Sequence, residues 1–210
     1  MNNAYDRLFY NQFAGKNVER LAALSDGIFA VAMTLLLLEL HTPPRERIHS
    51  EADLWRGLAA LAPQLLVYLM SFITLGIFWV GQQTQLNLLA RSDRHLTWTH
   101  LAFLFAVTLA PFSTRLLAEF ITFRAALLTY WANILLLGVL LFLTWLRATR
   151  ARLVKEDVTA VMRSAVYRRI VVAQSLYACG ALLCVFGTYW SIAFIVLVQL
   201  NYAVAPSLRG

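Results

Sequence analysis

Long apolar stretches separated by short polar segments dominate the chain, and each stretch approaches the length that a membrane-crossing helix needs. The first, roughly residues 19–40, holds a run of eighteen residues in which only Ser25, Asp26 and Thr34 are polar. At about 1.5 Å per residue, a helix of that length nearly matches a hydrocarbon core of about 30 Å. The pattern therefore predicts a transmembrane helix with one carboxylate inside it.

Prolines interrupt the pattern at two places. Pro43 and Pro44 end the first stretch, because proline cannot continue a helix. Pro111 lies inside the third stretch, where we expect it to kink or locally break the helix. We expect an all-α integral membrane protein that forms a single domain, residues 1–210. Its six expected spans are roughly 19–40, 58–85, 96–117, 124–146, 170–188 and 189–206.

Composition favours the same class of protein. The chain has 60% apolar and only 14% charged residues, with a mean hydropathy of +0.64. Ordinary soluble domains carry about 25% charged residues, so a soluble fold is a poor match. Residues 1–17 contain no apolar core of the kind that a cleavable signal peptide has.

Basic residues divide unevenly between the two sides that six spans would create. Thirteen of the eighteen Lys and Arg residues fall on the side of the N-terminus, and five fall on the other. The positive-inside rule then predicts a multi-pass protein of the cell inner membrane or plasma membrane with both termini cytoplasmic. The basic segment 147–169 is interpreted as a topology determinant that contacts anionic lipid headgroups. We therefore expect the lipid bilayer, and no nucleic acid, as a partner.

Motifs that carry chemistry are missing from the sequence. It contains none of the common metalloprotease, serine-hydrolase or nucleotide-binding motifs, and no paired Cys and His set at ligand spacing. We therefore expect no enzyme activity, no metal site, no cofactor and no small-molecule substrate. His100, just inside the third span, is either a member of a hydrogen-bonded network or an interfacial residue.

A heptad-like spacing runs along one face of the first span. Such a line of residues either meets copies of itself or forms an ordinary packing face within one bundle. Glu39 lies at its outer end, where a ring of carboxylates would concentrate cations. We call this line the seam, and it consists of Arg20, Leu24, Gly27, Val31, Thr34 and Leu38, with Leu35 beside it.

Asp26 lies off the seam, in the part of the first span nearer the cytoplasm. A carboxylate inside a membrane span costs about 2.5–3.5 kcal/mol on insertion scales, so it should face a partner or water rather than lipid. Candidate donors from other helices are Gln82, Trp79, His100 or the Arg20 of a neighbouring chain.

The segment from Arg20 to Gly27, RLAALSDG, resembles the R-x-x-x-F-S-D-G motif of the prokaryotic members of the endosomal and lysosomal potassium channel family, transmembrane protein 175. The continuation IFAVAMTLLLLEL also resembles the rest of the family's first helix. Later stretches that are similar to its second, third and fourth helices are Phe78-Trp79, Ala110-Pro111-Phe112-Ser113-Thr114 and Tyr130-Trp131-Ala132-Asn133.

The resemblance implies a homotetramer of six-helix subunits that conducts potassium ions through a central pore lined by the first helix. It implies no re-entrant filter loop, and no cofactor other than the permeant ions. The family's constriction is apolar, a hydrophobic gate. The positions of this constriction correspond to Val31, Thr34 or Leu35, and Leu38 in this chain. The helical spacing of the seam independently indicates the same residues.

The resemblance also implies that Arg20, Ser25 and Asp26 tie the first helix to the second and third helices. Three positions depart from the family pattern. Leu24 replaces the motif Phe, Gln82 or Gln83 stands where a His is usual, and His100 stands where an Asn is common. The expected structural polar network consists of Arg20, Ser25, Asp26, Trp79, Gln82 and His100.

A secondary ion-coupled transporter is the alternative function. It would use Asp26 as a titrating or substrate-binding carboxylate at a broken helix. Transporters of this kind usually show internal repeats, and none is visible in this sequence.

Overall fold

The computed structural model describes residues 17–38 and 40–204, with side chains described as far as Tyr202. Within these ranges the chain is helical, apart from short connections and one isolated bridge between Leu89 and Val154. The α-helices are α2 (Val18–Leu38), α3 (Glu51–Ala60), α4 (Ala62–Asn87), α5 (Arg94–Thr108), α6 (Ala110–Glu119), α7 (Arg124–Arg150), α8 (Ala160–Leu182) and α9 (Thr188–Val204). Two short 3-10 helices are η1 (Arg45–Arg47) and η2 (Leu183–Val185).

Five helical segments of the described chain are long and apolar enough to cross a membrane. They are α2, α4, α5 continued by α6, α7, and α8 continued by η2. The sixth expected span corresponds to α9, which has 17 residues and ends where the described chain ends. The count of six spans therefore stays a prediction.

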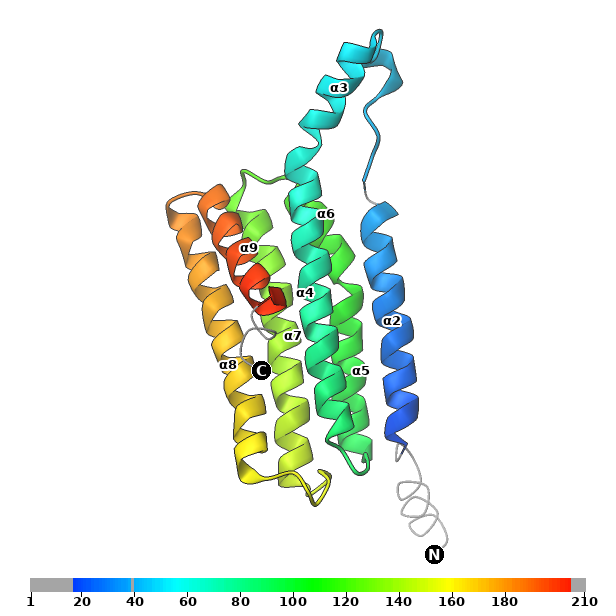
Figure 1. The fold of residues 1–210 in the computed structure, drawn as a ribbon, viewed down its shortest axis with the longest axis vertical. Helices are drawn as coiled ribbons and strands as arrows, with labels where there is room; N and C mark the ends of the chain where they lie inside the picture. The colour runs from blue at the N-terminus through cyan, green and yellow to red at the C-terminus, as the bar shows by residue number, and fades with distance from the viewer. Residues whose placement is uncertain (1–16, 39, 205–210) are drawn as a thin grey trace, which may run out of the picture.

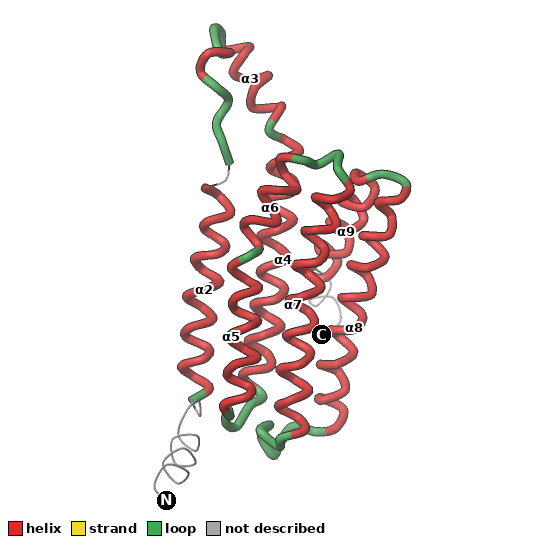
Figure 2. Tube along the Cα trace, turned by 180° about the vertical axis from the view of Figure 1, so that it is seen from behind, coloured by secondary structure: helices red, strands yellow, loops and turns green. Residues whose placement is uncertain are grey.

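The helices form an elongated bundle in which α2 and α8 lie at opposite edges (Figure 1). α2 packs against α4, α5 and α6, whereas α8 packs against α7 and α9. α3 projects beyond the end of the bundle, and the view from behind shows the same projection (Figure 2). The edge position of α2 leaves one of its faces uncovered by its own chain.

Two prolines begin helices after a local break. Pro63 lies in the first turn of α4, which starts only after α3 has ended at Ala60. α3 itself lies mostly between the first two expected spans, where the hydrophobic pattern predicts no helix, and Ser50 caps it by accepting from the Asp53 amide. At Pro111 the expected break is confirmed, because α5 ends at Thr108 and α6 begins at Ala110.

α8 begins ten residues before the apolar stretch that predicted it. Thr159 caps the helix by accepting from the Met162 amide, and Arg163 and Arg168 then lie within the first turns. Arginine is a good helix former, so the helix extends beyond its apolar part. A hydrophobic pattern in the sequence indicates only the part of a helix that lipid or the protein core would cover.

Aromatic rings join α2 to the bundle at its centre. Phe103 of α5 packs against Phe29 of α2 and Phe78 of α4, with ring centroids 6.1 and 6.4 Å apart. Phe29 and Phe103 are each 1% exposed. These contacts fix which face of α2 turns inward.

Candidate functional site

The two faces of α2 have opposite environments. The inward face carries five buried residues, whereas every seam residue is exposed. Val31 and Leu38 expose 57% and 74% of their surface, and Leu35 beside them exposes 42%. The seam therefore points away from the bundle of its own chain. The buried residues are Leu21, Ser25, Phe29, Ala32 and Leu36.

An apolar groove runs beside the seam, lined by Leu24, Val31 and Leu35 of α2 and by Thr108 at the end of α5. Gly27 also lines it, and a methyl group added at Gly27 would meet nothing within 4 Å. Within one chain, the small size of Gly27 is therefore not required by a close contact.

Thr34 provides a hydroxyl in the middle of the exposed face. Its Oγ1 donates to the carbonyl oxygens of Ala30 and Val31, at 2.9 Å each. Because the single hydroxyl proton is used within the helix, the oxygen keeps its acceptor capacity toward the outside. Glu39, the predicted outer carboxylate, lies outside the described residues.

Asp26 accepts two hydrogen bonds from α4. Trp79 Nε1 and Gln83 Nε2 both donate to its Oδ1, at 2.8 and 2.6 Å. The carboxylate is exposed at the edge of the α2–α4 contact, so these donors fix it without burying it. Gln83 was not among the predicted network residues, although its spacing of four from Trp79 places both side chains on one face of α4.

Ser25 is fully buried and has three polar partners. Its Oγ donates to the Leu21 carbonyl at 2.7 Å, accepts from Gln82 Nε2 at 3.1 Å, and lies 2.8 Å from His100 Nε2. A hydroxyl has one donor and two acceptor positions, so the set is complete when His100 Nε2 carries the proton. Of the two readings of His100, the structure favours membership of this network, with 1% of the residue exposed.

Two predicted network residues lie differently from expectation. The Arg20 side chain is exposed and has no hydrogen-bond or ion-pair partner among the described residues; its backbone amide donates to Asn17 Oδ1. Gln82 donates to Ser25, whereas the sequence pattern predicts it among the possible donors to Asp26. One chain thus brings together Ser25, Gln82 and His100 in one group, and Asp26, Trp79 and Gln83 in another.

The charged pair Asp93–Arg147 holds the N-terminal end of α5, the helix that carries His100. Asp93 caps α5 through the Leu96 amide at 2.7 Å, and Arg147 Nε of α7 donates to its other oxygen at 3.1 Å. Partial burial alone would raise the pKa of Asp93, but the hydrogen bonds from Arg147 and Leu96 and the arginine charge together lower it.

The side chains at this site contact one another and hold the helices in position. In the part of the chain that the structure describes, no group of three or more His, Cys, Asp or Glu side chains could hold a metal ion. The hydrogen bonds of Ser25 and Asp26 fix the rotation of α2 against α4 and α5, and this rotation turns the seam outward.

Comparison with known proteins identifies the family of this chain. The family model described as endosomal/lysosomal potassium channel TMEM175 matches residues 20–111, which cover α2 to the start of α6. A potassium channel of Streptomyces collinus is 37% identical over 102 residues, 49% of this chain and 48% of that one. A potassium channel of Chamaesiphon minutus is 34% identical over 135 residues, 63% of this chain and 66% of that one. The chain belongs to the TMEM175 family.

A solved structure extends the similarity over nearly the whole chain. The crystal structure of a lysosomal potassium-selective channel TMEM175 homolog from Chamaesiphon minutus matches with a TM-score of 0.79 and 27% identity. The match covers 90% of this chain and 97% of that chain. A more distant TMEM175 relative from Danio rerio, 23% identical over 88% of this chain and 34% of its own length, is named a proton channel. The chain spans about half to two thirds of the bacterial relatives that it matches, at 48% and 66% of their lengths.

Proposed function

We propose that four copies of this chain assemble around one axis lined by α2 and form a potassium-preferring cation channel. The observation that carries the proposal is the outward orientation of the whole seam. The printed names of the Streptomyces and Chamaesiphon relatives support the ion and the activity. We infer no enzyme activity and no cofactor beyond the permeant ions.

A second copy of α2 explains the seam better than lipid does. Leucine or any other large apolar residue would satisfy a lipid-facing position, whereas Gly27 leaves an uncovered space and Thr34 presents an oxygen. Small residues at helix contacts in membranes allow backbones to approach closely. The exposed Arg20 also lacks a partner among the described residues, which fits a contact supplied by a neighbouring chain.

The constriction of this channel is proposed to lie at Val31, Thr34, Leu35 and Leu38. In an α-helix Val31 and Leu38 lie about one turn on either side of Thr34 and Leu35, so four copies would stack as rings about 5 Å apart along the axis. A ring of valine or leucine offers no oxygen to a dehydrating cation, so it can close by dewetting. The Thr34 oxygens are the nearby acceptors on that face, and Glu39 is proposed to concentrate cations at the outer mouth.

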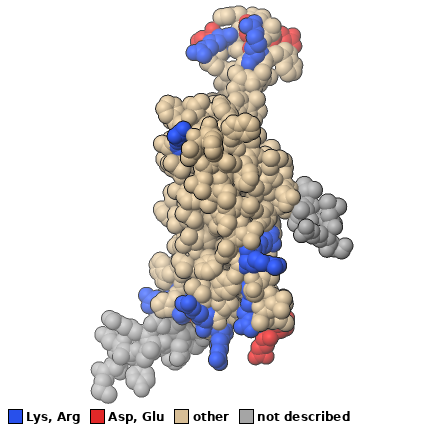
Figure 3. Space-filling view, turned by 90° about the vertical axis from the view of Figure 1, so that its left-hand side faces the viewer, with Lys and Arg blue, Asp and Glu red and all other residues tan. Residues whose placement is uncertain are grey.

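The distribution of charge supports an orientation with both termini cytoplasmic, in the inner or plasma membrane. Figure 3 shows Lys and Arg gathered mostly at the lower end of the bundle and on the projecting α3 segment, with a broad band of other residues between. The lower end holds the start of α2 and the α4–α5 and α7–α8 connections (Figure 1). The more basic side of a membrane protein is usually cytoplasmic.

A carrier that titrates Asp26 is the competing proposal. Against it, Trp79 and Gln83 already hold the Asp26 carboxylate, and α2 is continuous from Val18 to Leu38.

Mass measurement in nanodiscs, followed by planar-bilayer recording, separates the channel from the carrier. We expect tetramers and unitary currents far above the rate of carrier turnover. Active monomers or dimers would contradict a pore lined by α2, and reversal potentials in potassium, sodium and pH gradients identify the ion.

Polar substitution at the rings tests the constriction itself. We expect Val31→Asn and Leu38→Asn to raise current and lower the preference for potassium over sodium, because an amide keeps water in the narrow region. Thr34→Val should lower selectivity and leave assembly intact. Leu37→Asn, on the same helix but off the seam and 66% exposed, is the matched control. If both ring variants conduct like the unmodified channel, the seam is only a packing face.

A further inference from the structure

A row of aromatic side chains on α5 and α6 is uncovered by the rest of the described chain. Trp98, Phe105 and Phe112 recur every seven residues and expose 63%, 64% and 63% of their surface. Residues seven apart lie on the same side of a helix, and only Leu109 separates α5 from α6. Thr108, one turn from Phe105, lines the groove beside the seam, so this row flanks α2. We call Trp98, Phe105 and Phe112 the aromatic face.

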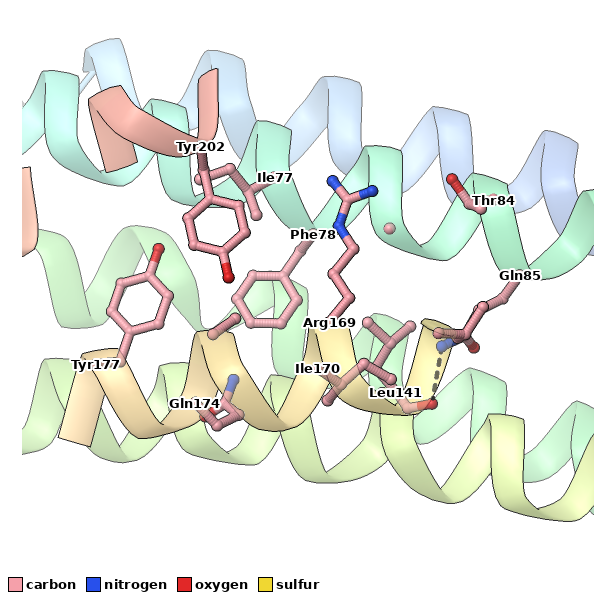
Figure 4. A pocket seen from close by; sticks show the side chains of 13 residues that line it. Ile77, Phe78, Thr84, Gln85, Leu141, Arg169, Ile170, Gln174, Tyr177 and Tyr202 are labelled. Atoms are coloured by element: carbon pink, nitrogen blue, oxygen red, sulfur yellow. Dashed lines mark hydrogen bonds between the residues drawn. The ribbon is translucent and has the colours of Figure 1, made fainter. Parts of the chain in front are cut away.

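α4 presents a second open face on the other side of α2. Leu69, Gly76 and Gln83 also recur every seven residues, and Gln83 donates to Asp26, which places this face beside α2. A methyl group added at Gly76 would meet nothing within 4 Å, so the face has a notch there. Phe78, about 200° around the helix from Gly76, instead lines a narrow space shared with α7 and α8 (Figure 4). We call Leu69, Gly76 and Gln83 the notched face.

The two faces match in depth along the bundle. α4 and α5 run in opposite directions from a short connection at the lower end of the bundle (Figure 1). Gly76 lies 11 residues before the end of α4 at Asn87, and Phe105 lies 11 residues after the start of α5 at Arg94. Both are therefore about 16 Å from the connection, at about 1.5 Å per residue. The other members of the two faces pair by the same count, at four and 18 residues from these ends: Gln83 with Trp98, and Leu69 with Phe112.

We propose that the aromatic face of each subunit packs against the notched face of its neighbour, with Phe105 inserted at Gly76. The inference rests on the proposed function, because it requires four copies of the chain around an axis lined by α2. Rotation about an axis normal to the membrane keeps every residue at its depth, so the matched levels meet. The contact joins two different surfaces, and four such heterologous contacts close a ring.

Charge complementarity supports a second copy of this chain, rather than lipid, as the occupant of both faces. The edge of α2 beside α4 carries Glu19 and Asp26, and neither has an ion pair within the described chain. Arg94 lies four residues before Trp98, so it continues the aromatic face toward the α4–α5 connection. Joining the two faces brings this basic residue to the acidic edge, whereas lipid tails would leave the Asp26 charge unpaired. Glycine at position 76 also suits a helix contact, because small residues allow close approach in membranes.

A pair of size changes tests the contact. Gly76→Leu adds a side chain where the single chain has room, so the subunit should fold, but the new side chain would overlap Phe105 of the neighbour. We expect the ratio of tetramer to monomer in native mass spectrometry to fall about tenfold or more, and Phe105→Ala in the same chain to restore it. Ser175→Leu, on exposed surface of α8, is the matched control and should stay tetrameric. A tetrameric Gly76→Leu protein, or no recovery in the double variant, would overturn the proposal.

Disulfide formation measures the same contact without a bulky substitution. We expect a chain with Gly76→Cys and Phe105→Cys to give a ladder of cross-linked species up to the tetramer under mild oxidation, because the two positions face each other across the interface. Phe105→Cys with Val171→Cys on α8 should give none beyond the background of the unmodified protein, which keeps Cys179 and Cys184. A protein that is tetrameric by mass but forms no ladder would overturn this interface and leave the proposed channel standing. A protein that stays monomeric would overturn both.

Discussion

Two polar regions inside the bundle differ in how they hold their helices. On the α2 side, two carboxylates take part in joining the helices, beside the neutral group of Ser25, Gln82 and His100: Asp26 connects α2 to α4, and Asp93 connects α5 to α7. On the α9 side, neutral hydroxyl and amide groups connect α4, α6, α7, α8 and α9. We call this second group the hydroxyl cluster, and it consists of Ser71, Thr74, Thr114, Tyr130, Tyr177 and Gln199.

Burial separates the hydroxyl cluster from the carboxylate Asp26. The members of the hydroxyl cluster are all at most 4% exposed, with Gln199 of α9 donating to Thr74 of α4 at 2.6 Å. Asp26, in contrast, is exposed at the edge of the α2–α4 contact. The hydroxyl cluster is completed within one chain, as is the buried group of Ser25, Gln82 and His100 on the α2 side, whereas the edge that carries Asp26 is left exposed. Changes on the α2 side should therefore affect assembly, and changes on the α9 side should affect the stability of the subunit.

The largest effect is expected at Asp26. In Asp26→Ala, Trp79 and Gln83 lose their acceptor and α2 loses its attachment to α4, so we expect loss of tetramer or of yield. Asp26→Asn is the matched control, because its amide oxygen can still accept both hydrogen bonds without the charge. Size-exclusion chromatography and native mass spectrometry measure the outcome. A tetrameric Asp26→Ala protein altered only in ion preference would place the carboxylate in the pathway instead.

The sequence predicted the α2 side better than the α9 side, for a physical reason. A carboxylate in an apolar run is anomalous, so Asp26 stood out, and the motif around it indicated helices two and three as its neighbours. The sequence did not determine whether Gln82 or Gln83 reaches Asp26. Adjacent helix positions differ by about 100° in direction, and the rotation of α4 depends on tertiary packing.

The sequence contains no feature that marks the hydroxyl cluster or α3 in the way that an isolated carboxylate marks Asp26. Ser71, Thr74 and Tyr130 are neutral residues scattered through apolar stretches, and their proximity depends on how several helices pack. Gln199 lies 125 positions from its partner Thr74. α3 carries Glu51, Asp53 and Arg56 within ten residues, and a short charged helix resembles a loop when hydrophobic periodicity is the guide.

A smaller effect is expected from Tyr130→Phe in the hydroxyl cluster. The change removes the hydroxyl that Ser71 and Thr74 contact at 3.3 and 3.1 Å, but both side chains keep backbone acceptors one turn earlier in α4. We therefore expect a loss of about 1 kcal/mol in the free energy of unfolding. Tyr189→Phe on exposed α9 surface is the control. Unchanged stability in denaturant titrations, or altered selectivity in bilayers, would contradict the division between the two sides.

The smallest effect concerns pH and the Asp93–Arg147 contact. The folded pKa of Asp93 lies below its ordinary value of 3.8, so ionised Asp93 stabilises the fold above that value, and the contribution is lost as pH falls through the folded pKa. Asp93→Ser keeps a side chain that can cap α5 and removes the charge, which isolates the contact with Arg147. The pair is partly exposed, with 27% of the Asp93 side chain accessible. Exposed pairs of this kind contribute about 0.5 kcal/mol, so we expect a small loss in the thermal midpoint at pH 7.

The same variant at low pH separates the effect of the Asp93 charge from that of its geometry. Between pH 7 and pH 5 neither protein should change on account of this residue, because Asp93 stays ionised when folded and when unfolded. Below about pH 4 the unmodified protein should lose its advantage and approach Asp93→Ser, since protonation removes the charge that serine lacks. Thermal midpoints in detergent across this range measure the difference. A constant gap at pH 3 would mean that geometry rather than charge holds this end of α5, and the contrast with the neutral α9 side would disappear.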